Sequence, residues 1–209
     1  MHITWHGQYT VKIASKDAAV IIDPYAPSVG LPAFRGKADV VALSNPADKT
    51  MSHTSGLQGE PIIINTPGEY SLRGMALHAI PWQTEEGQER SLLQWLVEGI
   101  NVVHMGALTR ELSQEELQVL ERTGIDILII PVGAGTALNT KMALSLVSKI
   151  EPRIVIPIHY KIPKVTETLD PVDTFAKEMG VSPKGAEDKL TVRANRLPPD
   201  DMVTVILKA

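Results

Sequence analysis

The chain has 209 residues, of which 44% are hydrophobic and 21% charged, as is usual for a soluble globular protein with one core. Its net charge of −4 argues against a nucleic-acid partner, and the absence of cysteine excludes disulfides and thiolate metal sites. No stretch is apolar enough to span a bilayer, and the first residues lack a secretory pattern. We therefore expect a single cytoplasmic domain over residues 1–209, without membrane association.

The first half of the chain predicts β-structure. Tyr9, Val11 and Ile13 alternate with polar residues, which is the period of a half-buried strand. Arg73-Gly74 and Glu98-Gly99 each separate two β-rich runs, which favours hairpins. The predicted strands cover residues 3–5, 9–14, 18–22, 40–43, 62–64, 70–72, 76–80, 92–97 and 100–105, with polar loops at 44–60 and 81–90.

The second half alternates helices with buried strands. Ser113 and Glu116 form a capping-box pattern, which predicts a helix that ends at Gly124. An apolar helical face follows at Met142, Leu146, Val147 and Ile150, and a third helix is predicted from Asp170-Pro171 to Gly180. The remaining predicted strands cover residues 126–132, 154–158, 190–192 and 203–207. This order indicates a layered α/β fold with mixed sheets.

Polar residues follow several of these buried strands. The run Val40 to Leu43 opens into Ser44-Asn45-Pro46, His104 ends another strand, and His159 follows Ile154–Ile158. Strand ends combine a rigid scaffold with adaptable loops, and α/β proteins commonly place their functional residues there.

Six stretches at such points resemble the metallo-β-lactamase superfamily, in the branch that includes ascorbate-6-phosphate lactonase and related small metal-dependent hydrolases. They are residues 3–8, 20–25, 66–70, 103–106, 129–133 and 155–160. Their order and spacing cover nearly the whole chain. The resemblance implies an αββα sandwich: two mixed β-sheets packed face to face, helices outside, and an active site at the edge where the strand-end loops converge.

The family's dinuclear centre, usually zinc, takes its ligands from a His-x-His-x-Asp-His loop, a later His, a bridging Asp and a final His. Aligned with that loop, Asn45 and Ala47 replace the first two histidines, and Lys49 and Thr50 replace the Asp-His pair. A one-residue deletion would instead match Asp48 to the aspartate and Lys49 to the last histidine.

The downstream ligand positions of the family are also changed. Gln83 lies about where the next histidine belongs, and Ala107 where the bridging aspartate belongs. Only His159 matches, as a residual ligand position. Zinc sites take three or four ligands, and Lys49 would repel two dications. We therefore predict no metal and no other cofactor.

The remaining candidates each allow a functional and a structural interpretation. The pocket candidates are Asn45, Asp48, Lys49, Gln83, His104 and His159. Asp48 and Lys49 form either an acid–base pair that fills the former metal space or a pair on the surface. We expect His104 to be structural, and His159 to hydrogen-bond inside the former pocket. Gly133-Ala134-Gly135 is either a phosphate cradle or a tight turn.

Two hypotheses follow. The favoured one is a pseudoenzyme on the hydrolase scaffold with a binding or assembly role, its partner being a small molecule in the vestigial pocket, another protein or a second copy in a homo-oligomer. The alternative is a hydrolase of lactone or phosphoester-type substrates with an atypical site. That site would hold one zinc or manganese ion through His159, Asp48 and His53, or act without metal through Lys49 and His159.

Overall fold

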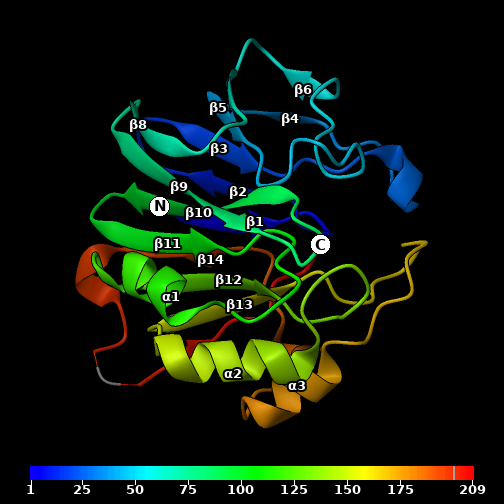
Figure 1. Ribbon diagram of the computed structural model, residues 1–209, viewed down its shortest axis with the longest axis vertical. Helices are drawn as coiled ribbons and strands as arrows, with labels where there is room; N and C mark the ends of the chain where they lie inside the picture. Colours follow the sequence, from blue (N-terminus) through cyan, green and yellow to red (C-terminus); the bar gives the residue numbers. More distant parts are fainter. Residues whose placement is uncertain (200) are drawn as a thin grey trace.

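The computed structural model describes residues 1–199 and 201–209, which form two large β-sheets packed face to face (Figure 1). The first sheet has six strands and is antiparallel at one end and parallel at the other. In spatial order its strands are β14 (Leu190–Thr191), β1 (His2–Trp5), β2 (Val11–Ala14), β3 (Ala19–Ile22), β5 (Val40–Ala42) and β7 (Ile62–Ile64).

The second sheet has seven strands and is also mixed. Four strands, β15 to β11, run parallel to their neighbours, and the pairs from β11 to β8 are antiparallel. In spatial order its strands are β15 (Val203–Thr204), β13 (Ile154–Ile158), β12 (Ile127–Pro131), β11 (Ile100–His104), β10 (Glu89–Val97), β9 (Met75–Gln83) and β8 (Gly68–Leu72).

The main hydrophobic core lies between the two sheets. Because successive side chains of a strand point to opposite faces, Val20 and Ile22 of β3 join this core while Ile21 faces outward. Trp5 from the first sheet and Trp95 from the second are both buried in it. The predicted sandwich of two mixed sheets is therefore confirmed.

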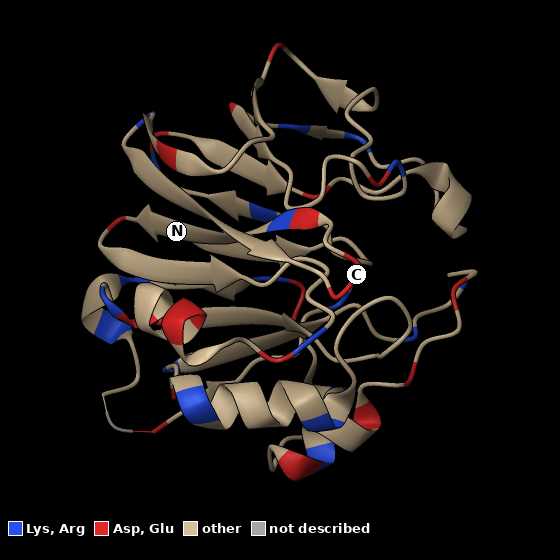
Figure 2. Cartoon of the chain, in the orientation of Figure 1, with Lys and Arg blue, Asp and Glu red and all other residues tan. Residues whose placement is uncertain are grey.

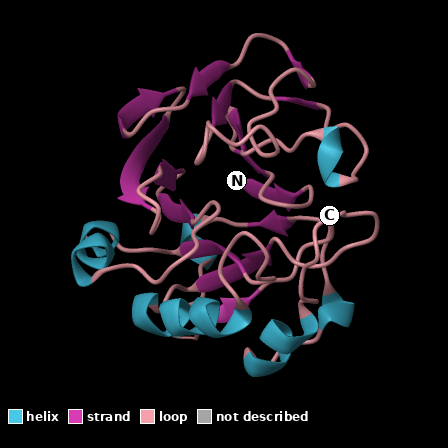
Figure 3. Cartoon of the chain, turned by 45° about the vertical axis from the view of Figure 1, so that its right-hand side comes forward, coloured by secondary structure: helices cyan, strands magenta, loops and turns pink. Residues whose placement is uncertain are grey.

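Within the described residues, the α-helices α1 (Gln114–Glu121), α2 (Thr140–Ile150) and α3 (Asp173–Glu178) lie on the side of the molecule that holds β12 and β13 (Figures 1 and 3). The Ser113–Glu116 capping box forms as predicted. The third helix begins at Asp173, with Val172 as its N-cap, and not at Asp170-Pro171 as expected. Phe175 and Ala176 anchor this short helix in the core.

A layer of loops, not an α-helix, covers the outer face of the first sheet. Residues 24–39 and 43–58, which flank β5 and are called the loop layer below, contain the 3₁₀ turn Pro27–Val29 and a two-stranded ribbon of β4 (Gly36–Lys37) and β6 (Leu57–Gln58). Tyr25, Val29, Phe34 and Ala38 pack on Ile21 as a small second core. The first sheet is therefore covered by loops, whereas the α-helices lie on the side of the second sheet.

The hairpin of β9 and β10 is longer than the sequence indicated. Residues 81–83 and 89–90, predicted as loop, continue the two strands through Gln83↔Glu89 and Ser91↔Pro81 pairs. Pro81 is tolerated because β8 pairs β9 only up to Ala79, so the position that lacks an N–H faces no neighbouring strand. Conversely, Tyr9 and Thr10, predicted as strand, form a turn in which the Thr10 N–H donates to the Gly7 carbonyl.

No helix in residues 1–199 and 201–209 has both the length and the apolar character that crossing a bilayer requires. Acidic and basic residues are interspersed along the chain, as the colours of Figure 2 show.

Candidate functional site

The carboxyl ends of β3, β5, β11, β12 and β13 converge at one edge of the sandwich (Figure 1). Backbone hydrogen bonds tie the segments after β13 and β5 to the turn after β1 and to β10. The His159 N–H donates to the Gln8 carbonyl over 3.2 Å, and the Ser91 N–H donates to the Ser44 carbonyl over 2.8 Å. This edge is where the sequence predicted the functional site.

Asp23, Ser44 and His104 form a buried polar network under this edge. The Asp23 carboxylate accepts hydrogen bonds from the Ser44 N–H (2.7 Å) and the Ser44 Oγ (2.6 Å). His104 Nδ1 lies 3.9 Å from Asp23 Oδ2, accepts from the Gly106 N–H, and leaves Nε2 to donate to the Tyr9 carbonyl. All three side chains are buried, so the network ties strand ends together without facing solvent.

Burial determines the protonation of this network. It raises the pKa of Asp23 to about 7, against the lowering effect of the Ser44 hydrogen bonds. It also lowers the pKa of His104 to about 4, which keeps the imidazole neutral near neutral pH. His104 is therefore a neutral, buried side chain whose two ring nitrogens bond backbone groups.

His159 lies in the left-handed region with φ of 50° and is completely buried. Its ring stacks on Tyr9, with the ring centroids 4.1 Å apart, and its Nε2 lies 3.1 Å from Glu167 Oε2. Glu167 Oε1 also accepts from the N–H and hydroxyl of Thr136. Burial alone would raise the pKa of Glu167, but the hydrogen bond and charge of His159, followed by the Thr136 contacts, lower it to about 2.

A cavity of about 330 Å³ opens beside Glu167. Its lining comes from the turn after β1, from the loop layer, and from the loops that follow β12 and β13. The lining residues are the apolar or aromatic Tyr9, Val29 and Met51, the neutral polar Gln8, Ser28, Thr50, Thr136 and Thr166, and the carboxylates Asp48 and Glu167.

The predicted pocket residues of the loop after β5 separate in the structure. Asp48 lines the cavity, and its Oδ1 accepts from the N–H and hydroxyl of Thr50. Asn45 is buried but does not line the cavity. Lys49 is exposed and outside the lining, so of the two interpretations left open for it the structure favours the surface position.

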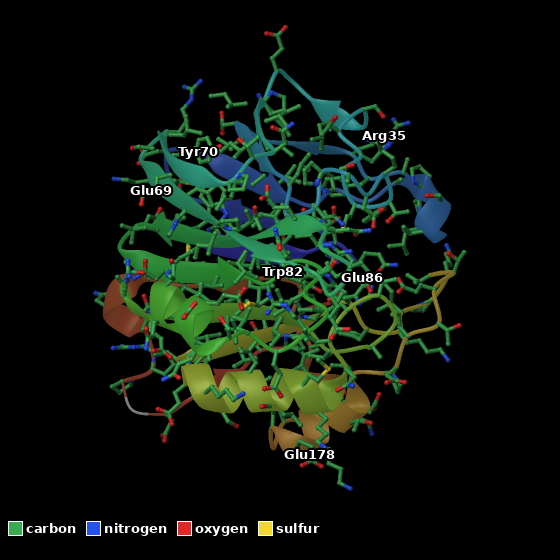
Figure 4. All side chains as sticks on the ribbon, viewed as in Figure 1. Arg35, Glu69, Tyr70, Trp82, Glu86 and Glu178 are labelled. Atoms are coloured by element: carbon green, nitrogen blue, oxygen red, sulfur yellow. The ribbon has the colours of Figure 1, made fainter. Side chains whose placement is uncertain are left out.

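Gln83 and Ala107, the other aligned ligand positions, also lie away from the cavity lining. Gln83 is exposed, and its carbonyl accepts from Arg110 Nε. The Ala107 carbonyl accepts from Arg90 Nη1 over 2.8 Å. Both arginines lie over the Trp82 ring, at 5.3 Å for Arg110 and 5.7 Å for Arg90 from ring centroid to Cζ. Trp82 itself lies toward the end of β9 (Figure 4).

Two further interpretations are decided by geometry. His53 Nε2 pairs with the Ser55 hydroxyl, and His53 does not line the cavity, so it does not join Asp48 and His159. In the Gly133–Gly135 segment, the first two N–H groups donate to the carbonyls of His159 and Leu138. That segment is a tight turn, because two of the three donors of a phosphate cradle are already used.

The donor set does not fit the dinuclear metal centre that the resemblance implies. Among the described residues, no three His, Asp or Glu side chains meet in a geometry that could hold a metal ion. His159, the matched ligand position, is stacked on Tyr9 and bonded to Glu167. We therefore derive no chemistry through a metal at this edge.

Sequence reasoning missed most of the cavity lining, including Gln8, Tyr9 and Glu167; of the predicted pocket residues only Asp48 lines it. Gln8 and Tyr9 follow the first strand, within or beside a stretch used for the resemblance, but neither is a ligand type of the family. Glu167 lies in the irregular segment between β13 and α3 and belongs to no motif. Only the fold brings it 3.1 Å from His159.

Comparison with known proteins agrees with this architecture. Residues 2–159 match the model of the β-lactamase superfamily domain. A metal-dependent hydrolase from Lysinibacillus sphaericus (strain C3-41) is 25% identical over 196 residues, a match that covers 77% of this chain and 85% of the relative. A metal-dependent hydrolase from Geobacillus sp. (strain WCH70) is 24% identical over 195 residues, with coverage of 77% and 85%.

A solved structure from Thermotoga maritima, assigned as a Zn-dependent hydrolase of the metallo-β-lactamase superfamily, superposes with a TM-score of 0.79 at 24% identity. That superposition covers 99% of this chain and 98% of the other. The family model spans most of the two sheets and the strand-end loops described above. This chain belongs to the β-lactamase superfamily and has its metallo-β-lactamase fold.

Proposed function

We propose that this protein is a non-catalytic binding protein on the metal-dependent hydrolase scaffold, and that it takes a small molecule in the cavity beside Glu167. The donor set at the strand-end edge carries the proposal, because no three His, Asp or Glu side chains of the described residues converge there. The cavity nevertheless persists at the family's active-site edge. A scaffold with a cavity but without the metal ligands suits binding better than metal-dependent hydrolysis.

The residues around the former metal positions support this proposal. The loop after β5 contains no histidine from Ser44 to Thr50, and His159 is already paired with Glu167. Arg90, a fixed cation, bonds the carbonyl of Ala107, which stands where the family has its bridging aspartate. A nearby cation opposes the binding of dications.

Hydrolysis at an atypical site is the second candidate, and the names of the relatives from Lysinibacillus and Geobacillus favour it. The His159–Glu167 pair at the cavity is the strongest acid–base group for such chemistry. The residues first suggested for it are less suitable, since His53 and Lys49 lie outside the cavity lining.

Metal analysis and turnover assays separate the two candidates. Protein purified without chelator is analysed for zinc, manganese and iron, then assayed with generic phosphodiester, lactone and thioester substrates before and after incubation with these metals. We expect substoichiometric metal and no turnover above the rate without protein. Stoichiometric metal together with turnover that is lost in His159→Ala would overturn the proposal and establish the hydrolase.

A further inference from the structure

A second hollow in the surface, called the groove below, has a volume of about 710 Å³, within the range of small-molecule sites. It is lined by the end of β1, the loop layer, the segment after β13 and the last residues of the chain. Its lining includes four of the nine Phe, Trp and Tyr residues of the chain, which are Trp5, Tyr25, Phe34 and Tyr160. The groove therefore offers an aromatic surface to a ligand.

The groove is separate from the cavity beside Glu167. Neighbouring residues of three segments divide between the two: residues 5–6, 31–35 and 162–164 line the groove, whereas residues 8–9, 28–29 and 166–167 line the cavity. Between them the Thr166 N–H donates to the Val29 carbonyl over 3.0 Å. A Cβ atom on Gly30 would also clash with the Lys164 carbonyl. Backbone in direct contact therefore divides the two sites.

The aromatic rings form a rigid apolar floor. The ring centroids of Trp5 and Tyr160 lie 4.5 Å apart, and those of Tyr25 and Phe34 lie 5.7 Å apart. All four side chains are more than nine-tenths buried, so the two cores fix their positions. A surface that is already ordered binds an apolar group without the cost of immobilising its own side chains.

Tyr25 adds an open hydrogen-bond donor to this floor. Its side chain is only 6% exposed, and its hydroxyl has no hydrogen-bond partner among the described residues, whereas the Tyr160 hydroxyl donates to the Leu207 carbonyl. The Tyr25 hydroxyl is nevertheless not one of the unpaired polar atoms that the fold closes off from solvent. Burial raises the pKa of Tyr25, which keeps this hydroxyl protonated and able to donate. An O–H donor left open beside an apolar surface suits a ligand with an acceptor oxygen.

The charged side chains of the groove are all cationic. Arg35, Lys164 and Lys208 are in the lining, and no Asp or Glu is. Lys208 pairs with Asp188 over 3.1 Å. Arg35, on the loop layer (Figure 4), and Lys164 have no ion pair with a carboxylate among the described residues. These two cations outnumber the single α-carboxylate in the lining, that of Ala209, so the groove favours an anion.

We propose that the groove binds a small organic anion with an aromatic body. The body packs on the floor formed by the four rings, and an oxygen of the anionic head accepts from the Tyr25 hydroxyl. Arg35 and Lys164 balance the charge of the head. This second site goes beyond the proposed function and does not depend on what the cavity beside Glu167 binds.

The first test is calorimetric titration of the full chain with sodium 4-phenylbutyrate. The matched controls are 4-phenyl-1-butanol and 4-phenylbutylammonium chloride, because the three compounds differ only in the group that ends a phenyl-bearing four-carbon chain. We expect saturable binding of phenylbutyrate, with an affinity about tenfold or more above that for the alcohol and no binding of the ammonium ion. Equal binding of acid and alcohol, stronger binding of the ammonium ion, or no binding of any compound would overturn the proposal.

Variants then locate the binding. Arg35→Gln together with Lys164→Gln removes both cations from exposed positions, and Tyr25→Phe removes only the open hydroxyl. We expect each variant to raise the Kd for phenylbutyrate about tenfold, which corresponds to about 1.4 kcal/mol. The wild-type affinity should fall as sodium chloride is added, because salt screens exposed charges, and the double variant should lose most of this dependence.

The control for the lost charge is Lys141→Gln on α2, an exposed cation outside the groove lining, which should leave the Kd unchanged. A Kd that is unchanged in both the double variant and Tyr25→Phe would place phenylbutyrate elsewhere and overturn the inference. Failure of every compound in a protein whose dimerisation is weakened by the double variant would make the groove an interface between copies, which also overturns it.

The outcomes keep this inference apart from the proposed function. Metal-free protein without turnover that fails to bind phenylbutyrate would contradict the anion site alone. Stoichiometric metal with turnover that is lost in His159→Ala, alongside phenylbutyrate binding that is weakened by Tyr25→Phe, would overturn the proposed function and support the anion site.

Discussion

At the scale of single residues, Asp23 and His104 have opposite effects on the pH dependence of stability. Folded Asp23 keeps its proton up to a pKa of about 7, whereas the unfolded side chain ionises near 3.8, so the free energy of unfolding falls with rising pH between these values. Folded His104 stays neutral down to a pKa of about 4, whereas the unfolded imidazole is protonated below 6.5. Its contribution therefore rises with pH over much of the same window.

Because the two windows overlap, we expect the two slopes to cancel in the wild-type protein between about pH 4 and pH 6.5. Asp23→Asn should leave the His104 contribution alone, so the free energy of unfolding gains a positive slope of about 1.4 kcal/mol per pH unit relative to wild type. Urea denaturation at several pH values in this window measures how the free energy of unfolding changes with pH.

His104→Gln should change that slope in the opposite direction, since only the Asp23 contribution then remains. The double variant should return to the wild-type slope. Parallel pH profiles for wild type and Asp23→Asn would show that Asp23 is ionised throughout the window, contrary to the effect of its burial.

At the scale of elements, the sequence predicted most strands and helices but not how the site is composed. The Ser113 capping box and the buried strand 154–158 form as predicted, because their signals are local. The β9–β10 extension was missed because Pro81 indicates a loop unless it is known that β8 does not pair with β9 beyond Ala79. Glu167 was missed because its contact with His159 depends on the path of the segment between β13 and α3, which no local pattern specifies.

The loops after β5 and β11 meet at Gly106, which has φ of +55°. A Cβ atom there would lie 2.4 Å from Ser44 Oγ and 2.7 Å from Ser44 Cβ. We expect Gly106→Ala to lower the free energy of unfolding by about 2–5 kcal/mol, as the sum of backbone strain and displacement of Ser44. Equilibrium denaturation of the variant measures this loss.

Gly124→Ala is the matched control for this change. Gly124 also has positive φ, at +71°, but a Cβ there would have no neighbour within 4 Å. The free energy of unfolding of Gly124→Ala should therefore fall only by the cost of backbone strain, about 1–2 kcal/mol. Equal losses in the two variants would mean that Ser44 moves aside freely, and that the two loops are not tightly joined.

At the scale of the whole molecule, the protein has two hydrophobic cores of unequal size. The main core lies between the sheets, and the second consists of Ile21, Tyr25, Val29, Phe34 and Ala38 under the loop layer. A small core with few buried side chains opens locally at lower free energy than a large one. The loop layer should therefore exchange its amide hydrogens faster than β10 to β13.

Phe34→Ala tests this difference, because Phe34 is 7% exposed and contacts the rings of His6 and Tyr25. We expect hydrogen exchange monitored by mass spectrometry to become faster in residues 24–39 and 43–58 and to stay unchanged in β10 to β13. The same change in the main core, Phe175→Ala, should accelerate exchange throughout the molecule. Uniform acceleration by Phe34→Ala would show that the two cores unfold as one unit.

The loop layer also supplies Val29, Asp48, Thr50 and Met51 to the cavity, whereas Gln8 and Tyr9 belong to the turn between β1 and β2. The lining residues of the loop layer contribute unequally to stability. Val29 and Met51 are buried in the two cores, whereas Asp48 is half-buried and Thr50 is exposed. The protein can therefore acquire a new ligand specificity through changes at such exposed or half-buried loop positions while the sheets continue to fold as before.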